Sequence, residues 1–215
     1  MSRHFVGFLI LALAGCSNGG HVSVPSKGAF AATEMSAKDL ALLRDPVVIR
    51  SILGGAARED DADTIRSLAR HGVDVDTPLG EGRTALTLAA YHRSEKAVQA
   101  LLEVHADPDG HGALSPLMHA AFAGDDAVVT ELVVAGAPVD RPTPYGQTPL
   151  MFAALFGRQS TYDALVRLGA DENAQDGAGM TPKRLRAYAN DAQAVEGFLD
   201  RASTKLGDLA RSVRP

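Results

Sequence analysis

The chain of 215 residues contains a single cysteine, Cys16. A disulfide needs two cysteines, so no bridge within the chain can hold the fold, and burial of apolar side chains must do so. The chain also lacks a Gly-x-Ser-x-Gly nucleophile motif, a phosphate-binding loop and the two-histidine helix of zinc proteases. We therefore expect a protein that is not an enzyme and that binds no cofactor.

Positive charge is also in deficit. The chain has 21 Lys and Arg residues against 26 Asp and Glu residues, which gives a formal net charge of −5. Proteins that bind DNA or RNA neutralise phosphates with basic side chains, and they usually carry a basic patch or stripe. This composition argues against a nucleic-acid partner.

The chain has a single long apolar run near its start, from Phe5 to Ala14, preceded by Arg3. The run is too short to span a bilayer core, which takes about 20 residues. A basic residue, a short apolar run and small residues are typical of a secretory signal peptide. The sequence Leu13-Ala14-Gly15-Cys16 resembles the lipobox of bacterial lipoproteins, in which the cysteine becomes the lipidated mature N-terminus. The alternative is an ordinary signal peptide followed by an incidental cysteine.

The resemblance predicts a signal peptide over residues 1–15 and a lipid on Cys16. Several acyl chains hold a protein stably on a membrane. We expect the lipid to be the only contact of this protein with the membrane. Ser17 stands where an Asp favours inner-membrane retention in enteric bacteria, so we expect an outer-membrane location that faces the periplasm. Residues 16–36, rich in small residues and Gly, predict a flexible tether.

The rest of the chain repeats itself. A Ser or Thr recurs after 33, 31, 33 and 33 residues, and we call these positions the opening column: Ser51, Thr84, Ser115, Thr148 and Thr181. A second set follows 21 residues after each of the first four, and we call it the closing column: Gly72, His105, Gly136 and Gly169. A fixed period of this length is the mark of a repeat architecture.

Each column has a physical role. Ser or Thr can cap a helix start, and Pro at 116, 149 and 182 suits the first helical position. Ala pairs five and six residues after the first four opening positions allow close helix packing. Apolar residues at offsets of 14, 17 and 18 form one stripe on a second helix, which a closing Gly would end. Such a helical hairpin cannot bury its apolar face alone, so the units must stack.

The Thr-Pro-Leu-x-x-Ala-Ala opening, Gly124, Gly157 and the Gly169-Ala170-Asp171 ending resemble ankyrin repeats over roughly residues 46–202. The resemblance implies an all-α solenoid of about five helix-turn-helix units, with degenerate first and last units as caps. It places a repeat domain at residues 37–204 and a C-terminal helical extension or tail at residues 205–215. The usual turn Gly is replaced at three positions, by Asp60, Arg93 and Asn190.

In ankyrin repeats the two residues at offsets seven and eight end the first helix and face the groove where partners usually bind. Here these positions are largely aromatic and apolar, and such side chains often carry interface energy. The alternative is that they pack against adjacent helices or against the finger loops between units. The predicted contact residues are Arg58, Tyr91, His92, Phe122, Leu155, Phe156 and Tyr188, with Tyr145 on the finger tip at 143–147. The other finger tips are expected at 79–83, 111–114 and 175–180.

Together these features predict a monomeric, non-catalytic protein-binding module, lipid-anchored in the periplasm, that captures a protein in its groove. Such a module would act as an envelope scaffold or as an immunity-type inhibitor of a toxin or enzyme. The alternative is a metal-binding or enzymatic lipoprotein that uses the His105–His119 region, where Asp107, Asp109 and His111 lie close in sequence.

Overall fold

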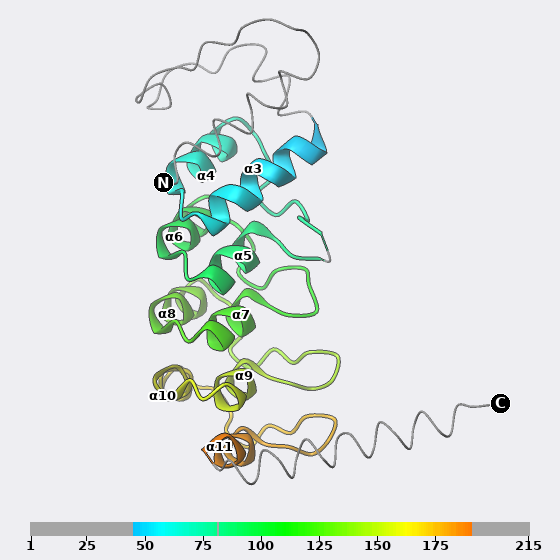
Figure 1. Ribbon diagram of the computed structural model, residues 1–215, viewed down its shortest axis with the longest axis vertical. Coiled ribbons are helices and arrows are strands. Elements are labelled where there is room, and N and C mark those ends of the chain that lie inside the picture. Colours follow the sequence, from blue (N-terminus) through cyan, green and yellow to red (C-terminus); the bar gives the residue numbers. More distant parts are fainter. Residues whose placement is uncertain (1–44, 81, 191–215) are drawn as a thin grey trace, which may run out of the picture. The chain divides into compact units, whose positions relative to one another are not determined.

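A computed structural model describes residues 45–80 and 82–190 of the chain. Within these ranges the chain forms nine helices (Figure 1): α3 (Pro46–Arg58), α4 (Ala62–Arg70), α5 (Ala85–His92), α6 (Glu95–Glu103), α7 (Pro116–Ala123), α8 (Asp126–Val134), α9 (Pro149–Leu155), α10 (Gln159–Arg167) and α11 (Pro182–Asn190). None of these described helices has both the length and the apolar character that a membrane crossing requires. The predicted signal peptide, Cys16, the tether, residues 37–44 and the tail at 205–215 lie outside the described residues.

The helices form stacked pairs in each of two units, which divide after Gly112. In the first unit α3 packs on α5 and α4 packs on α6. In the second unit α7 packs on α9, α8 on α10, and α9 on α11. The prediction of an all-α repeat protein is confirmed, with four helix pairs and the first helix of a fifth within the described ranges.

The core lies between the helices of each unit and is made of the predicted columns. Offsets 14 and 17 are buried in all four described pairs: Ile65 and Leu68, Val98 and Leu101, Val129 and Leu132, Tyr162 and Leu165. The Ala pairs are buried as well: Ala56 and Ala57, Ala89 and Ala90, Ala120 and Ala121, Ala153 and Ala154. Offset 18 is only half-buried, so the buried stripe is narrower than predicted.

The opening column caps helices at three of its five positions. The hydroxyls of Thr84, Ser115 and Thr181 accept from the backbone N–H three residues on, at 3.3, 3.2 and 3.3 Å. The prediction is wrong at Ser51, which lies inside α3, because this helix begins at Pro46 behind an Asp45 cap.

The predicted cap is also wrong at Thr148. The backbone N–H of Met151 donates to the Thr148 carbonyl at 3.0 Å, so the N–H that the hydroxyl would cap is already used. The Thr148 hydroxyl is buried and finds no hydrogen-bond partner among the described residues. A short 3₁₀-like turn has therefore replaced the side-chain cap at this helix start.

Left-handed backbone closes the turns whether or not glycine is present. The replaced turn positions Asp60 and Arg93 have φ of 58° and 60°, close to Gly157 at 63°. In the closing column His105 has φ of 66°, where Gly136 has 102°. Side chains with a Cβ are disfavoured there by roughly 1–2 kcal/mol, so the repeat geometry outweighs local preference.

Candidate partner-binding surfaces

Finger loops follow the second helix of each described pair and lead into the first helix of the next. Three of the four predicted fingers close with the same backbone hydrogen bond, between offsets 28 and 32 of their units. The N–H of Leu79 donates to the Arg83 carbonyl at 2.7 Å, that of Thr143 to Gln147 at 2.8 Å, and that of Asp176 to Met180 at 3.0 Å. The sequence therefore located these three loops correctly.

The two fingers of the second unit are held together. The N–H of Gly177 donates to the carbonyl of Tyr145 at 2.8 Å. A Cβ built on Gly146 would lie 3.0 Å from the Cα of Asp176, and Gly146 has φ of 79°, so glycine is required there. This contact fixes the finger that carries Tyr145, whose side chain is 78% exposed.

In the second unit an apolar cluster, made of Phe122, Leu155 and Phe156, occupies the ends of α7 and α9. The rings of Phe122 and Phe156 meet edge to face, with centroids 4.4 Å apart at 74°. Phe122 is half-buried, whereas Leu155 and Phe156 remain 46% and 44% exposed. The two rings therefore pack against each other, while Leu155 and Phe156 stay open to solvent. Contact of these residues with a partner stays a prediction.

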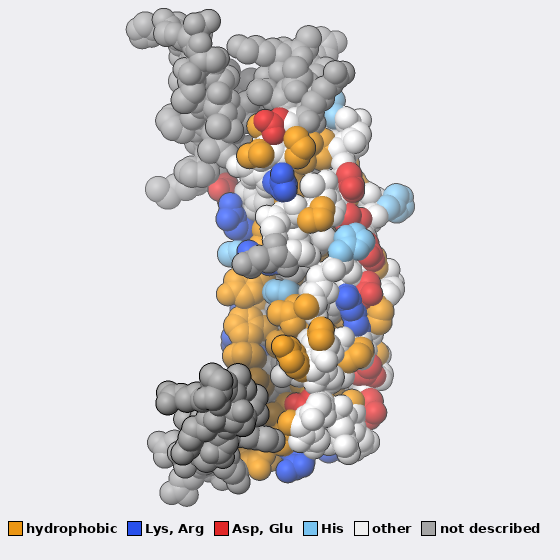
Figure 2. Space-filling model, turned by 90° about the vertical axis from the view of Figure 1, so that its right-hand side faces the viewer, with side chains coloured by type: hydrophobic (Ala, Val, Ile, Leu, Met, Phe, Trp, Pro, Cys, Tyr) orange, Lys and Arg blue, Asp and Glu red, His pale blue; other side chains and the backbone are white. Residues whose placement is uncertain are grey.

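The backbone beneath the apolar cluster is tied between repeats. The Nε of Arg158 donates to the carbonyl of Phe122 at 2.9 Å. Its side chain also covers Gly124, where an added Cβ would lie 2.7 Å from the Arg158 Cδ. Figure 2 shows hydrophobic side chains gathered along one margin of the face in view. Tyr188, on α11, is half-buried.

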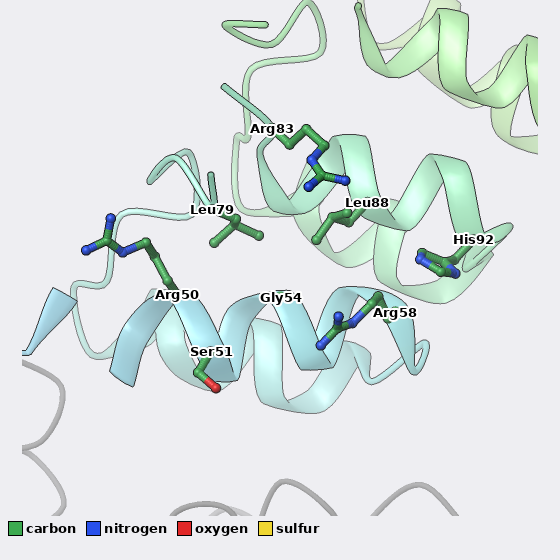
Figure 3. Close-up of a pocket in the computed structure, with 8 residues that line it drawn as sticks. All are labelled: Arg50, Ser51, Gly54, Arg58, Leu79, Arg83, Leu88 and His92. Atoms are coloured by element: carbon green, nitrogen blue, oxygen red, sulfur yellow. The ribbon is translucent and has the colours of Figure 1, made fainter. Parts of the chain in front are cut away.

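In the first unit the predicted residues Arg58, Tyr91 and His92 end α3 and α5. Tyr91 is 46% exposed, and its ring lies edge to face against the His92 imidazole, with centroids 5.2 Å apart at 82°. Arg58 and His92 also border an open cleft of about 350 Å³ (Figure 3). We call this space the basic cleft, and its lining is Arg50, Ser51, Gly54, Arg58, Leu79, Arg83, Leu88 and His92.

Sequence reasoning missed Arg50 and Arg83 as members of a site. Both precede an opening-column residue, Ser51 and Thr84, whereas the same position holds Gln147 in the fourth repeat. An Arg at this position in the first two repeats was therefore a visible feature. Its meaning depended on the packing of α3 on α5, which brings the two positions to one cleft.

The charge of the basic cleft comes from its arginines. Burial lowers the pKa of His92 below its usual 6.5, and the nearby Arg58 charge lowers it further. The imidazole is therefore largely uncharged at neutral pH. Among the described residues no Asp or Glu lines this cleft.

The histidines of the metal-binding alternative have separate local roles. His105 occupies the left-handed closing position of its unit. The Nδ1 of His111 lies 3.9 Å from an oxygen of Asp107, and the Nδ1 of His119 lies 2.9 Å from the Ser115 carbonyl. Across residues 45–80 and 82–190, no group of three or more His, Cys, Asp or Glu side chains is placed to hold a metal ion. That alternative stays a prediction.

Two known proteins are similar to parts of this chain. A segment of 94 residues is 37% identical to SH3 and multiple ankyrin repeat domains protein 2 of Homo sapiens, covering 42% of this chain and 5% of that protein. A segment of 85 residues is 31% identical to putative ankyrin repeat protein YahD of Escherichia coli (strain K12), covering 39% of this chain and 42% of that protein. The chain thus matches less than half the length of each relative.

A family model described as "Ankyrin repeats (3 copies)" matches residues 42–112 and 104–176, which is more than half of the chain. Ankyrin repeats are usually non-catalytic modules that bind other proteins. The stacked helix pairs, the finger loops and this match agree, and the chain belongs to the ankyrin-repeat family.

Proposed function

We propose that this protein captures a partner protein through the exposed apolar side chains that end the first helices of its repeats. The observation that supports the proposal most directly is the exposure of Leu155 and Phe156, at 46% and 44%. Large apolar side chains at the centre of an interface commonly cost about 2 kcal/mol or more on truncation. In the first unit Tyr91, also 46% exposed, would add a further anchor.

The packing beneath these side chains favours binding. Phe156 is held edge to face by Phe122, and the backbone of Phe122 is held by Arg158. A side chain that is ordered before binding loses little rotamer entropy when the partner arrives. The Phe122–Phe156 ring pair is therefore better suited to a partner interface than side chains without such a contact would be.

The proposal extends to a place in the cell. We propose that residues 1–15 direct export, that Cys16 is lipidated, and that residues 16–36 tether the repeats to the periplasmic face of the outer membrane. The support is the apolar run from Phe5 to Ala14 and the Leu13-Ala14-Gly15-Cys16 sequence. The partner would be an envelope enzyme that is held in place, or a toxin or enzyme that is inhibited.

Capture is tested by cross-linking in cells, recovery of the protein, and quantitative mass spectrometry of what comes with it. We expect the double variant Leu155→Ala and Phe156→Ala to lose the main partner, because the exposed apolar contact area is gone. Val134→Ala is the matched control, since Val134 is 79% exposed at the end of α8 in the same unit. Recovery of the same partner at the same level with the double variant would remove the proposal, provided that circular dichroism shows unchanged helix content.

The anchor is tested by Cys16→Ser. We expect this variant to leave the membrane fraction and to lose incorporation of labelled palmitate, because the thiol that would carry the lipid is absent. Persistent membrane association would count against lipidation at this position. Deletion of the gene then separates the two roles: partner activity rises if the protein inhibits, and the partner is mislocalised if the protein is a scaffold.

A further inference from the structure

We infer that the basic cleft of the first unit binds an acidic segment of the partner protein, in which two carboxylates flank an aliphatic side chain. This inference rests on the proposed function, because it names the chemistry of a second contact that the same partner would make.

The shape of the basic cleft comes from one small residue between two helices. Gly54 is buried on α3, and a Cβ built there would lie 3.4 Å from Leu79 and 3.7 Å from Leu88. Every larger side chain would fill the floor, so the glycine leaves the space open. Figure 3 shows Leu79 and Leu88 above Gly54 and between the charged groups. The middle of the cleft therefore suits an aliphatic side chain.

The charges stand at the two ends and along one wall. Arg50 lies at one end of the cleft, and Arg58 lies with His92 at the other (Figure 3). Arg83, from the finger, lies on the α5 side. The Nε of Arg50 donates to the Pro46 carbonyl at 3.0 Å, which directs this side chain along the start of α3. Separated cations on either side of an apolar floor match separated carboxylates on an extended segment.

The charge balance selects the occupant. The whole chain carries a formal net charge of −5, yet three arginines line this cleft. Guanidinium groups bind carboxylates in a planar, two-hydrogen-bond geometry, and complementary charge makes association fast and specific. The volume, about 350 Å³, is near the lower end for small-molecule pockets, and the cleft is open to solvent. A short stretch of polypeptide fits such a cleft better than an enclosed ligand does.

The test uses the full chain and a fluorescein-labelled peptide of sequence Glu-Leu-Glu-Glu-Leu-Glu, followed by fluorescence anisotropy at low and at physiological salt. We expect saturable binding, and the matching Gln-Leu-Gln-Gln-Leu-Gln peptide should not bind. The double variant Arg58→Glu and Arg83→Glu should bind about tenfold more weakly or worse. The double variant with Lys at both positions should lie between, because lysine keeps the charge and loses the paired hydrogen bonds.

Arg70→Glu is the matched control. Arg70 is exposed on α4 in the same unit and does not line the basic cleft, so its reversal should change affinity by about twofold or less after salt screening. An amide NMR spectrum provides an independent readout, in which the acidic peptide should shift the signal of Gly54. The Lys variant keeps both positive charges, so it keeps the test valid if the Glu variant unfolds.

Four results would overturn the inference. Equal weakening by the Arg70 variant and the Arg58–Arg83 variant would mean general attraction of charge. Equal binding of the Gln peptide would remove the role of carboxylates, and binding of inorganic phosphate without any response to the peptide would assign the cleft to phosphate. Partner capture that still depends on Leu155 and Phe156, with no peptide binding, would overturn this inference and leave the proposed function standing.

Discussion

The two units use the same repeat positions for different chemistry. Arg58 and His92 of the first unit stand where Phe122 and Phe156 stand 64 residues later. In the first unit the Arg58 charge helps to lower the pKa of His92, and in the second unit the two rings meet edge to face with centroids 4.4 Å apart. One pair of positions thus gives a basic cleft in one unit and an apolar cluster in the other.

The contacts beneath these side chains are more alike. The N–H groups of Asp107 and Asp171 donate to Asp76 and Asp140, at 3.1 Å in both units. In both units the bond joins offset 25 of one repeat to offset 23 of the next. The ankyrin frame therefore depends on buried columns and on repeated backbone contacts, whereas the exposed ends of the first helices are free to differ.

A second hydrogen bond between repeats has an equivalent acceptor in both units and a different donor. In the first unit the Ser94 hydroxyl donates to the Arg58 carbonyl at 3.4 Å, and in the second the Nε of Arg158 donates to the Phe122 carbonyl at 2.9 Å. The acceptor is a backbone atom, so it does not depend on the side chain at its position. This separation lets the surface change without loss of the stacking.

The largest expected effect tests whether buried leucines contribute equally to stability in the two units. Leu101 and Leu165 occupy the same offset in the second and fourth repeats, and both are fully buried. We expect Leu101→Ala and Leu165→Ala each to lower the free energy of unfolding by roughly 2–5 kcal/mol, because each leaves a cavity. Urea denaturation followed by circular dichroism measures the loss.

Val134→Ala is the control for this pair, since an exposed truncation should change the free energy of unfolding by about 0.5 kcal/mol or less. If one leucine variant lost stability and the other did not, the two units would not share the same packing frame.

A smaller effect is expected in the closing column, where the units differ. His105 has φ of 66° in the first unit, and Gly169 has φ of 97° in the second. His105→Gly should raise the free energy of unfolding by about 0.5–1 kcal/mol, because relief of backbone strain exceeds the added freedom of the unfolded chain.

Gly169→Ala should act in the opposite direction. No described atom lies within 4 Å of a Cβ built there, so backbone strain is the only cost. Thermal unfolding of both variants, scanned side by side, measures the signs. Destabilisation by His105→Gly would show that the imidazole contributes more than its backbone strain costs.

Much of the repeat architecture was predictable, because each column of residues has a local structural preference. Helical period, the Ala pairs and the closing glycines each specify one part of the hairpin, and a common spacing shows that they belong together. The failures at Ser51 and Thr148 have a common cause. A side-chain cap forms only where a helix begins and where a backbone N–H still lacks a partner. Ser51 is not at a helix start, because α3 begins at Pro46. At Thr148 the N–H of Met151 already donates to the Thr148 carbonyl.

The surfaces were less predictable because they combine residues from several repeats. Offsets seven and eight identified Arg58 and His92, but the basic cleft also needs Arg83 from a finger and the missing side chain of Gly54. The edge-to-face contact of Phe122 with Phe156 likewise needs the stacking of α7 on α9. The period of the sequence predicts which face of a helix a residue occupies. Which residues of different repeats come into contact depends on tertiary packing.

The smallest expected effect tests the charge coupling that distinguishes the first unit. Burial and the Arg58 charge both lower the pKa of His92, so Arg58→Gln should raise it part of the way toward 6.5, and burial should hold it below that value. A lowered histidine pKa means that the unfolded chain binds the proton more readily. The contribution of His92 to the free energy of unfolding is therefore fully present above pH 6.5. It is lost as the pH drops from there through the folded pKa of His92. NMR titration of the His92 ring, with Arg70→Gln as control, measures the shift; an equal shift in both variants would show that net charge, and not the Arg58–His92 pair, sets this pKa.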